Sequence, residues 1–459
     1  MSATVVEARS GRGGEDRPVV VIGAGPAGLA AAEHLLDAGV RVVVLDGAPQ
    51  VGGLSRSVQL WGEPYDLGPH SFYSSSHPES VRRWLDLAGA AGGLERTVAR
   101  RGAVWRGRAV AFPPGPRDVL RAVGPAGALA LAASRSAARL PARRADAPPR
   151  TAHDALVARH GRAVVEELFV PYCRKYLGVG PQQLSAAFAD KLLGTRAGFS
   201  GPVELLTPAR GTGAVWEELA RRLRERGARI LLGTTVTGLD TEDGRISAVT
   251  ARDAGGESTL PVRAVVSSVP PPLLLRWLPG AATSRTAPAP GAGGPALRSR
   301  DTYLVHLLVE GEVGQQAHYV TAYDESLRVG RLTNTRAWRP QRFAGAPRTV
   351  LCAEFWSSGE DDLAARSDSE LAQLAVAELP AFGVDRGVRV VDCDVLRLPR
   401  SVPVLSLGHE AVLAGVDERL DAYPNLVRVG RHGRHDWDGQ EDSLLTGRSI
   451  GAHVLALPA

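Results

Sequence analysis

The chain has 459 residues, with 54 Lys and Arg against 49 Asp and Glu, and only three cysteines, which lie far apart. This length exceeds what one hydrophobic core usually organises, so it predicts two domains. The cysteines form no C-x-x-C pair or Cys/His metal spacing, and no aromatic-interleaved basic patch occurs. These features exclude a zinc site and a nucleic-acid-binding module, and they favour a reduced, cytoplasmic protein.

Residues 1–16 are polar and Gly-rich and lack the apolar core of a signal peptide, so they are predicted to be a flexible tail. The longest mainly apolar run, "AGALALAAS" at 126–134, is too short to span a bilayer. We therefore expect no integral membrane span.

The first structured segment predicts a βαβ unit. Residues 18–22, "PVVVI", are a β-branched apolar run typical of a strand buried on both faces. Residues 29–38 have helical composition and are followed by Gly39, and residues 40–46 form a second such strand. This order opens a parallel sheet.

The middle of the chain predicts a helical region. Residues 79–88 have a helical pattern, and residues 151–200 are mostly helical. Residues 117–150 are rich in Ala and Arg. They predict a solvated helix that runs into a loop, with a basic lip contacting an acidic substrate or a membrane surface as the alternative. The arginines concerned are Arg135, Arg139, Arg143, Arg144 and Arg150.

The second half alternates between sheet and helix. An amphipathic helix at 214–227 precedes a strand and a hairpin that turns at "DGR", and "AVVSS" at 264–268 is a further buried strand. Strand-like segments fill 302–356. The remaining predictions are a helix at 367–380, a strand near 388–396, a strand at 425–430 and a helix from about 442 to 456.

The motif between the first strand and helix is G-x-G-x-x-G, formed by Gly23, Gly25 and Gly28. In this pattern the first glycine permits a tight turn, the second lets the backbone approach a pyrophosphate, and the third lets the helix pack on the strand. Asp46 ends the second strand, where a carboxylate can accept the ribose hydroxyls. The combination predicts a dinucleotide site.

A second glycine turn, "VGGLSRS", follows within a few residues of Asp46. NAD does not need this turn, whereas it suits the longer FAD molecule. Here the chain resembles the FAD-dependent amine oxidase superfamily, and "GTTVTGLDTEDGRISAV", "AVVSSVP" and "VGRHGRHDWDGQEDSLLTG" resemble its later motifs in order. No C-terminal cysteine matches the covalent flavin link, so the resemblance implies non-covalent FAD.

The resemblance implies an α/β (α+β overall) fold: a Rossmann-like FAD-binding domain and a discontinuous substrate domain of helices plus a mixed sheet. The expected ranges are 17–90, 205–280 and 415–459 for the FAD-binding domain, 91–204 for a helical cap, 281–297 for a loop and 298–414 for the sheet. The implied cofactor-binding residues are Gly23, Gly25, Pro26, Ala27, Gly28, Asp46, Gly52, Gly53, Leu54, Arg56, Gly68, Pro69, His70, Val236, Ser267, Gly430, Arg431, Asp442 and Ser443.

Within the superfamily the chain is closer to protoporphyrinogen-oxidase-like proteins and UDP-galactopyranose mutases. "DLGPHSF" is similar to their Gly-x-His-x-Phe stretch against the flavin ring, and "PYCRKYLG" and "VGRLTNTRAW" resemble two further segments. The resemblance implies His70, Arg331 and Arg431 as catalytic residues. It implies a substrate pocket formed by Tyr172, Lys175, Tyr176, Arg331, Asn334 and Trp437.

Three functions remain open, of which a flavin-binding protein without turnover is the least favoured. The first is an FAD-dependent oxidoreductase that passes hydride from a small molecule, which could be a sugar or nucleotide sugar, to flavin N5. The alternative is a pyranose/furanose mutase that acts on a nucleotide sugar through an N5 adduct, with Arg331 and Arg431 stabilising the departing diphosphate. Val402 to Leu405 and Trp437-Asp438 depart from the family pattern and leave the substrate open. No metal or nucleic acid is expected.

Overall fold

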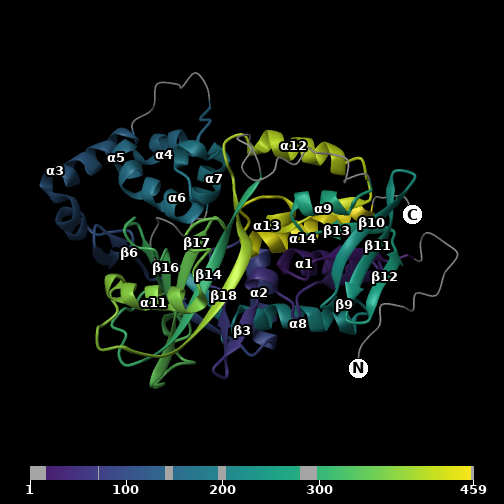
Figure 1. Ribbon diagram of the computed structural model, residues 1–459, viewed down its shortest axis with the longest axis horizontal. Helices are drawn as coiled ribbons and strands as arrows, with labels where there is room; N and C mark the ends of the chain where they lie inside the picture. Colours follow the sequence, from purple (N-terminus) through teal and green to yellow (C-terminus); the bar gives the residue numbers. More distant parts are fainter. Residues whose placement is uncertain (1–16, 71, 140–147, 195–202, 280–296, 456–459) are drawn as a thin grey trace. The chain divides into compact units, whose positions relative to one another are not determined.

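The computed structural model describes residues 17–70, 72–139, 148–194, 203–279 and 297–455 (Figure 1). The predicted tail at 1–16 and nearly all of the predicted loop at 281–297 lie outside these residues. The chain forms two compact units, each built from separate stretches. The first comprises Met1–Leu94, Arg210–Ala296 and Glu410–Ala459, and the second comprises Glu95–Ala209 and Leu297–His409.

The first unit is organised by a five-stranded sheet in the order β19-β13-β1-β2-β9, with all neighbours parallel. The residues of β1 are 0–4 % exposed, as expected for a strand in a sheet that is covered on both faces. The predicted α/β Rossmann-like fold is therefore confirmed. The strands are β1 (Val19–Ile22), β2 (Val42–Asp46), β9 (Arg229–Leu232), β13 (Ala264–Ser267) and β19 (Leu426–Arg428).

Smaller sheets and helices complete this unit. The hairpin predicted at "DGR" is confirmed, because Asp243 and Gly244 turn β10 into β11 with φ of +49° and +71°, but a third strand, β12, was not predicted. The sheets are β10 (Thr235–Glu242), β11 (Arg245–Asp253) and β12 (Gly256–Pro261), and β3 (Ser57–Leu60) and β4 (Glu63–Asp66). The helices are α1 (Pro26–Asp37), α2 (Pro78–Ala90), α8 (Thr212–Glu225), α9 (Pro271–Trp277), α12 (His409–Leu420), α13 (Gly430–Gly433) and α14 (Gln440–Leu455).

The second unit contains a seven-stranded sheet in the order β18-β14-β17-β16-β15-β6-β7. The β15–β6 pair is parallel and the other pairs are antiparallel, which confirms the predicted mixed sheet. The strands are β6 (Arg101–Trp105), β7 (Arg108–Ala111), β14 (Arg298–Glu310), β15 (Tyr319–Ala322), β16 (Arg331–Asn334), β17 (Arg348–Ser357) and β18 (Arg389–Val404). A separate two-stranded sheet pairs β5 (Leu94–Val98) with β8 (Glu204–Pro208).

Two of the strand predictions in this unit had wrong bounds. The strand expected near 388–396 continues to Val404, because β18 lies at the edge of the sheet, where prolines are tolerated. The region 302–356, expected to be strand-like, is interrupted by the short helix α10 (Thr335–Trp338), and its strand β16 covers only Arg331–Asn334.

Helices of the second unit lie between residues 116 and 194, but the start of the expected helical cap at 91–204 is not helical, because residues 94–111 form the strands β5, β6 and β7. The helix expected after residue 117 ends at Ala137 and is kinked, because Gly124 has φ +70° and ψ 176° and Pro125 follows it. Residues 140–147, which include Arg143 and Arg144, lie outside the described residues. The helices are α3 (Pro116–Ala137), α4 (Ala152–His160), α5 (Arg162–Val164), α6 (Val170–Leu177), α7 (Ala186–Gly194), α10 (Thr335–Trp338) and α11 (Asp368–Glu378).

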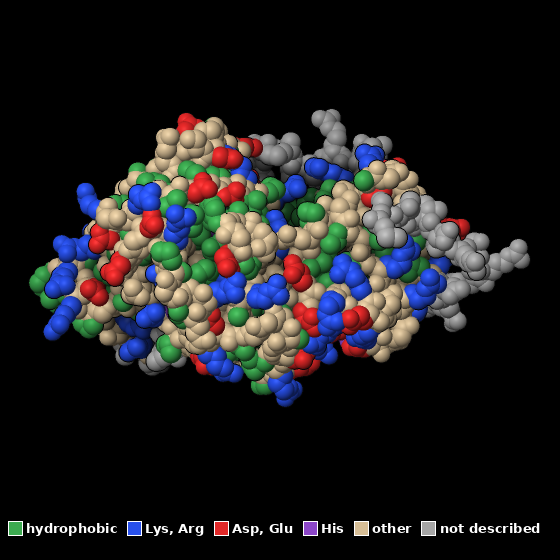
Figure 2. All heavy atoms as spheres, turned by 90° about the horizontal axis from the view of Figure 1, so that it is seen from below, with side chains coloured by type: hydrophobic (Ala, Val, Ile, Leu, Met, Phe, Trp, Pro, Cys, Tyr) green, Lys and Arg blue, Asp and Glu red, His purple; other side chains and the backbone are tan. Residues whose placement is uncertain are grey.

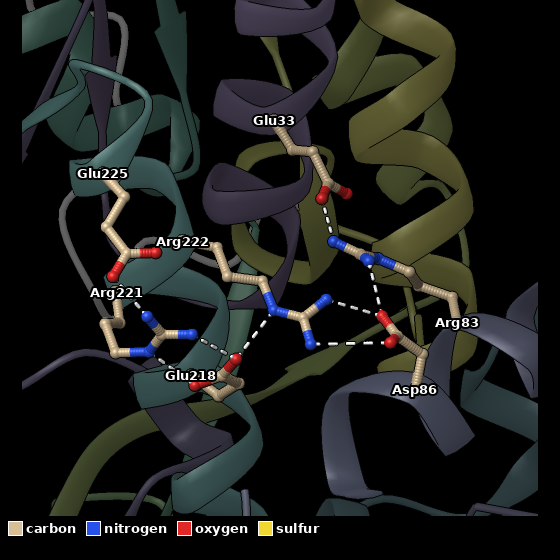
Figure 3. Close-up of polar contacts among 7 residues, drawn as sticks. All are labelled: Glu33, Arg83, Asp86, Glu218, Arg221, Arg222 and Glu225. Atoms are coloured by element: carbon tan, nitrogen blue, oxygen red, sulfur yellow. Dashed lines mark hydrogen bonds and ion pairs between the residues drawn. The ribbon is translucent and has the colours of Figure 1, made fainter. Parts of the chain in front are cut away.

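Charged side chains join three helices of the first unit (Figure 3). Arg83 of α2 donates to Glu33 of α1. Arg222 of α8 donates to Asp86 of α2 at 2.6 Å and to Glu218 of its own helix at 2.7 Å. Hydrogen bonds from Arg221, with those from Arg222, lower the pKa of Glu218 to about 2. The network holds α1, whose first turn contains Gly28 of the glycine motif, against two neighbouring helices.

The β3–β4 hairpin is attached to the start of α8 through one carboxylate. Gly211, the residue before α8, has no side chain that could cap the helix. Asp66 Oδ1 instead accepts from the Thr212 N–H at 2.9 Å and from Ser57 Oγ at 2.5 Å. A carboxylate at a helix N-terminus satisfies a free N–H group and interacts favourably with the helix dipole. Asp66 thus fixes the strand that leads directly to Gly68, Pro69 and His70.

We predict that Asp66→Ala lowers the free energy of unfolding of the first unit by about 1–2 kcal/mol, the typical loss for a helix cap. Urea unfolding followed by circular dichroism measures this loss. Asp240→Ala is the matched control, because Asp240 is exposed on β10 and away from helix termini. Equal midpoints for the two variants would show that Asp66 does not hold the hairpin to α8.

Candidate functional site

The glycine motif leaves no room for side chains at two of its three glycines. A Cβ at Gly28 would lie 1.9 Å from the Gly23 carbonyl oxygen, and a Cβ at Gly23 would lie 2.0 Å from Ser268 Oγ. Gly23 also has φ +105°, which favours glycine. Gly25 differs, because its φ is −76° and a Cβ there would meet only Gly53 Cα, at 3.8 Å. The backbone at Gly25, which precedes Pro26 and Ala27 of α1, is therefore open to a ligand.

The second glycine turn packs on the first. The Gly52 N–H donates to the Ala24 carbonyl at 2.8 Å, and Gly52 has φ +102°. Gly53 begins a short 3₁₀ helix, Gly53–Ser55, that contains Leu54. Arg56 Nη1 donates to the Gly53 carbonyl at 2.8 Å. Burial lowers the pKa of Arg56, and the charge of Asp46 partly offsets this effect.

Asp46 lies at the carboxyl end of β2, beside the glycine motif. Its Oδ2 accepts from the Ala24 N–H at 2.7 Å and its Oδ1 from the Ala48 N–H at 2.8 Å. The Thr234 N–H donates to the Asp46 carbonyl at 2.9 Å, which places the start of β10 next to it. Val236, two residues on, is 5 % exposed. The structure thus gathers Asp46 and Val236 from distant parts of the sequence.

The closing motif packs against the start of α1 at two glycines, and we call the residues around the β1–α1 turn the glycine cradle. A Cβ at Gly430 would lie 2.7 Å from Ala27 Cβ, and one at Gly447 would lie 2.4 Å from the Ala27 carbonyl oxygen. Ser267 is fully buried, and its carbonyl accepts from the Val429 N–H at 2.9 Å. Its neighbour Ser268 faces Gly23 and donates to the Ile22 carbonyl at 3.0 Å. The sequence analysis missed Ser268 and Gly447, since nothing in "SSVP" separates the two serines.

These residues fit a dinucleotide. Gly25 presents bare backbone at the start of α1, so a pyrophosphate can approach the positive end of the helix dipole. Asp46 keeps lone pairs for a ribose diol beside that helix. Gly25 and Asp46 would hold the pyrophosphate and ribose, and the Gly52–Arg56 turn provides a second backbone surface beside them.

His70 follows the β3–β4 hairpin and is half-buried. Gly68, with φ +91°, donates from its N–H to the Asp66 carbonyl at 2.8 Å, and Pro69 follows. On the other side Phe72 is 2 % exposed and stacks on Trp84, with ring centroids 4.5 Å apart. Gly68 therefore fixes the chain just before His70, and Phe72 is held by its contact with Trp84.

Arg431, Trp437, Asp442 and Ser443 also belong to the first unit. Arg431 Nε donates to the Asp438 carbonyl at 2.8 Å. Asp442 Oδ2 accepts from the Gly439 N–H at 2.8 Å at the start of α14, and Ser443 is 8 % exposed. These contacts order the loop that joins α13 to α14.

In the second unit Arg331 forms a bidentate ion pair with Glu354, which was not predicted from the sequence. Its Nε and Nη2 donate to Glu354 Oε1 and Oε2 at 2.7 and 2.6 Å, between the neighbouring strands β16 and β17. The Glu354 side chain is only 3 % exposed. Burial opposes the charge on Arg331, but the attraction of Glu354 outweighs it and raises the Arg331 pKa. The charge of Arg331 is thus neutralised within the protein.

Aromatic rings surround this pair. The Arg331 guanidinium carbon lies 5.7 Å from the ring centroid of Tyr319 and 5.5 Å from that of Trp356. Trp356 meets Tyr176 edge to face at 4.5 Å, and Tyr176 stacks with Tyr172 at 5.6 Å. We call these five residues, Arg331, Tyr319, Trp356, Tyr176 and Tyr172, together with Glu354 the aromatic cluster.

The structure therefore brings Tyr172, Tyr176 and Arg331 together, as the resemblance implied, and adds Tyr319, Glu354 and Trp356. The period-two alternation of "CAEFW" could have placed Glu354 and Trp356 on one face of a strand. Only the pairing of β16 with β17 shows which residue they meet. Asn334 is engaged with the backbone, since its Nδ2 donates to the Gln315 carbonyl at 2.8 Å and its Oδ1 caps α10.

Lys175 lies on α6 between Tyr172 and Tyr176 in sequence, and its ammonium group donates to the Leu327 carbonyl. Burial, only partly offset by Glu378 and other nearby charges, lowers its pKa to about 8. A half-buried lysine with such a pKa can lose its charge under mildly alkaline conditions.

Comparison with known proteins places this arrangement in a described family. The family model for flavin-containing amine oxidoreductases matches residues 26–454. A reduced UDP-galactopyranose mutase is similar, with a TM-score of 0.76 and 19 % identity over 96 % of each chain. A candidate protoporphyrinogen oxidase from Exiguobacterium sp. 255-15 has a TM-score of 0.69 and 18 % identity, covering 95 % of this chain and 98 % of its own. A triple mutant of putrescine oxidase has a TM-score of 0.62 and 17 % identity, covering 96 % and 99 %.

We predict opposite behaviour for two glycine variants. Gly25→Ala has space for its methyl group and should leave the stability of the apoprotein unchanged, but it should weaken FAD binding by about tenfold or more, equivalent to about 1.4 kcal/mol. Gly28→Ala should destabilise the apoprotein itself, because its methyl group would overlap the Gly23 carbonyl. Thermal unfolding of apoprotein and titration with FAD separate the two effects. Unimpaired FAD binding by Gly25→Ala would remove that backbone from the site.

We predict that the lowered pKa of Lys175 makes the stability of the protein depend on pH. Its pKa is about 8 in the folded protein and 10.5 in the unfolded chain, so the unfolded state binds more protons between these values. The free energy of unfolding should therefore rise with pH across this window, and the cost of the charge is fully present below pH 8. Lys175→Met should stabilise the protein at pH 7 by on the order of 2 kcal/mol and lose the rise. A rise of the same size in Lys175→Met would assign it to another group.

Proposed function

The chain belongs to the flavin-containing amine oxidoreductases and is an FAD-dependent enzyme, and we propose that it oxidises a small neutral molecule by removing hydride from carbon. When bound, FAD supplies a ring that accepts this hydride at N5. The first unit holds the cofactor through the glycine cradle, Asp46 and the Gly52–Arg56 turn. His70 is a neighbour of the flavin ring in this proposal, and Arg431 serves at the same site.

The observation that carries the choice of a neutral substrate is the Arg331–Glu354 pair. A diphosphate would need the planar fork of Arg331, whose Nε and Nη2 both donate to a carboxylate that is 3 % exposed. Breaking such a pair leaves a buried, uncompensated carboxylate, which costs about 3–5 kcal/mol. The aromatic cluster therefore favours a ligand that packs against rings, and a sugar is one candidate.

The alternative is a mutase acting on a nucleotide sugar. Its support is that Tyr172, Tyr176 and Arg331 lie together and that Arg431 lies at the flavin-binding motif. In this case a diphosphate would have to compete with Glu354 for Arg331.

The two proposals predict different outcomes in anaerobic mixing of the flavin-loaded enzyme. Oxidation predicts that a neutral substrate, tested among sugars and uncharged amines, bleaches the visible absorbance of the flavin without added reductant, and that oxygen restores it. A nucleotide sugar that isomerises only after dithionite, with no bleaching by any neutral compound, would replace oxidation by the mutase reaction.

Titration with uridine diphosphate supplies a second readout. Oxidation of a neutral molecule predicts no specific binding to the wild type. The alternative predicts binding that the double variant Arg331→Met/Glu354→Leu weakens about tenfold, without leaving a lone buried charge. Arg252→Met/Glu257→Leu is the control, because it removes an exposed ion pair from the β11–β12 hairpin.

A further inference from the structure

The α3 helix has no buried residue over its 22 positions, although half of it is apolar. Leu129 is 71 % exposed and Leu120 is 49 % exposed. In a helix that serves only to cover its own unit, one face would be expected to be buried. α3 instead contacts α4 and α5, and its Ser134 Oγ accepts from the Ala163 N–H at 3.0 Å.

The outward face of α3 is apolar over two turns. Ala126, Leu129, Ala130 and Ala133 are all exposed and follow the i, i+3, i+4, i+7 spacing of a single helical stripe. The same spacing usually marks the face that packs on a core. Here Ser134 is on the side of α3 that contacts α5, and the apolar stripe is turned to solvent.

Arginines lie at both ends of this stripe. Arg117 and Arg121 precede it, Arg135 and Arg139 follow it, and all four are exposed. Among the described residues none of these four forms an ion pair, and Asp118 is the only acidic residue of α3. We call the exposed stripe, Leu120 and the four arginines the α3 face. Figure 2 shows hydrophobic side chains flanked by Lys and Arg at its left end, where Figure 1 has α3.

The sequence around α3 also carries a net positive charge. Residues 101–162 contain twelve arginines and three aspartates, with no lysine or glutamate, whereas the whole chain has a net charge of only +5. The positive charge of the protein is therefore concentrated in this stretch. Clustered arginines can contact negatively charged headgroups, and exposed leucines can enter the apolar layer beneath them. This combination is complementary to the surface of an anionic lipid bilayer.

We propose that the α3 face docks the protein on an anionic lipid surface, with Leu120 and Leu129 entering the interface and the four arginines contacting headgroups. The helix lies on the bilayer and does not cross it. No helix in the described ranges is long and apolar enough to span a membrane, and the kink at Gly124 shortens each straight segment of α3. The proposal does not depend on which substrate the enzyme oxidises.

Cosedimentation of the flavin-loaded protein with vesicles tests the proposal. We expect binding to phosphatidylcholine vesicles that contain phosphatidylglycerol, weaker binding to phosphatidylcholine alone, and loss of binding as salt rises. Leu120→Gln/Leu129→Gln should weaken binding about tenfold or more. Arg117→Gln/Arg121→Gln should weaken it by a similar factor and reduce its salt dependence.

Matched controls use exposed positions elsewhere. Val376→Gln/Leu407→Gln removes two other exposed apolar side chains, and Arg224→Gln/Arg386→Gln removes two exposed arginines of α8 and of the segment after α11. Both should bind vesicles as the wild type does, and every variant should keep its flavin. No binding to the anionic vesicles at low salt, or equal losses in the control variants, would overturn the proposal. A dimer in sedimentation analysis that Leu129→Gln disrupts, without vesicle binding, would assign the α3 face to a second copy of the chain.

Discussion

The first unit depends on one steric constraint, the absence of side chains where β1 turns into α1. Gly28 lets α1 approach the Gly23 carbonyl, and Gly23 in turn leaves room for Ser268 from β13. Gly430 and Gly447 use the same absence of side chains to bring the end of the chain onto Ala27. Four distant stretches therefore meet around one turn. A single added methyl group at most of these positions would separate elements that together form the cofactor cradle.

The glycines of the cradle serve two purposes, the packing of the protein and the binding of the cofactor. Gly23 and Gly28 are required by the protein's own atoms, whereas Gly25 has space that the protein does not fill. The open position lies at the start of a helix, where the dipole favours a phosphate. The helices behind it are joined by the Arg83, Asp86 and Arg222 network, so the start of α1 is held on a rigid support (Figure 3).

The second unit handles charge differently on its interior and on its edge. Inside, Arg331 is matched by Glu354 and enclosed by Tyr319 and Trp356, so the cluster has little spare charge. On α3, arginines and leucines are left side by side in solvent. A charge without a partner is tolerated at the surface and costly in the interior. The aromatic cluster, proposed to recognise the substrate, therefore pairs its charge, whereas the α3 face, proposed to bind lipid, leaves its charges exposed.

The sequence by itself determined the βαβ opening, the parallel sheet and a dinucleotide site, because these follow from local periodicity and from glycines at fixed spacing. The mixed sheet and the choice of FAD came with the family resemblance. The sequence also indicated Arg331, Tyr172 and Tyr176, but only through resemblance. Tertiary structure alone decided that Glu354 occupies the fork of Arg331, that Ser268 and not Ser267 faces Gly23, and that the apolar stripe of α3 points outward. Each of these depends on strand register or helix rotation, which pairs residues far apart in the sequence and leaves no mark in the local pattern.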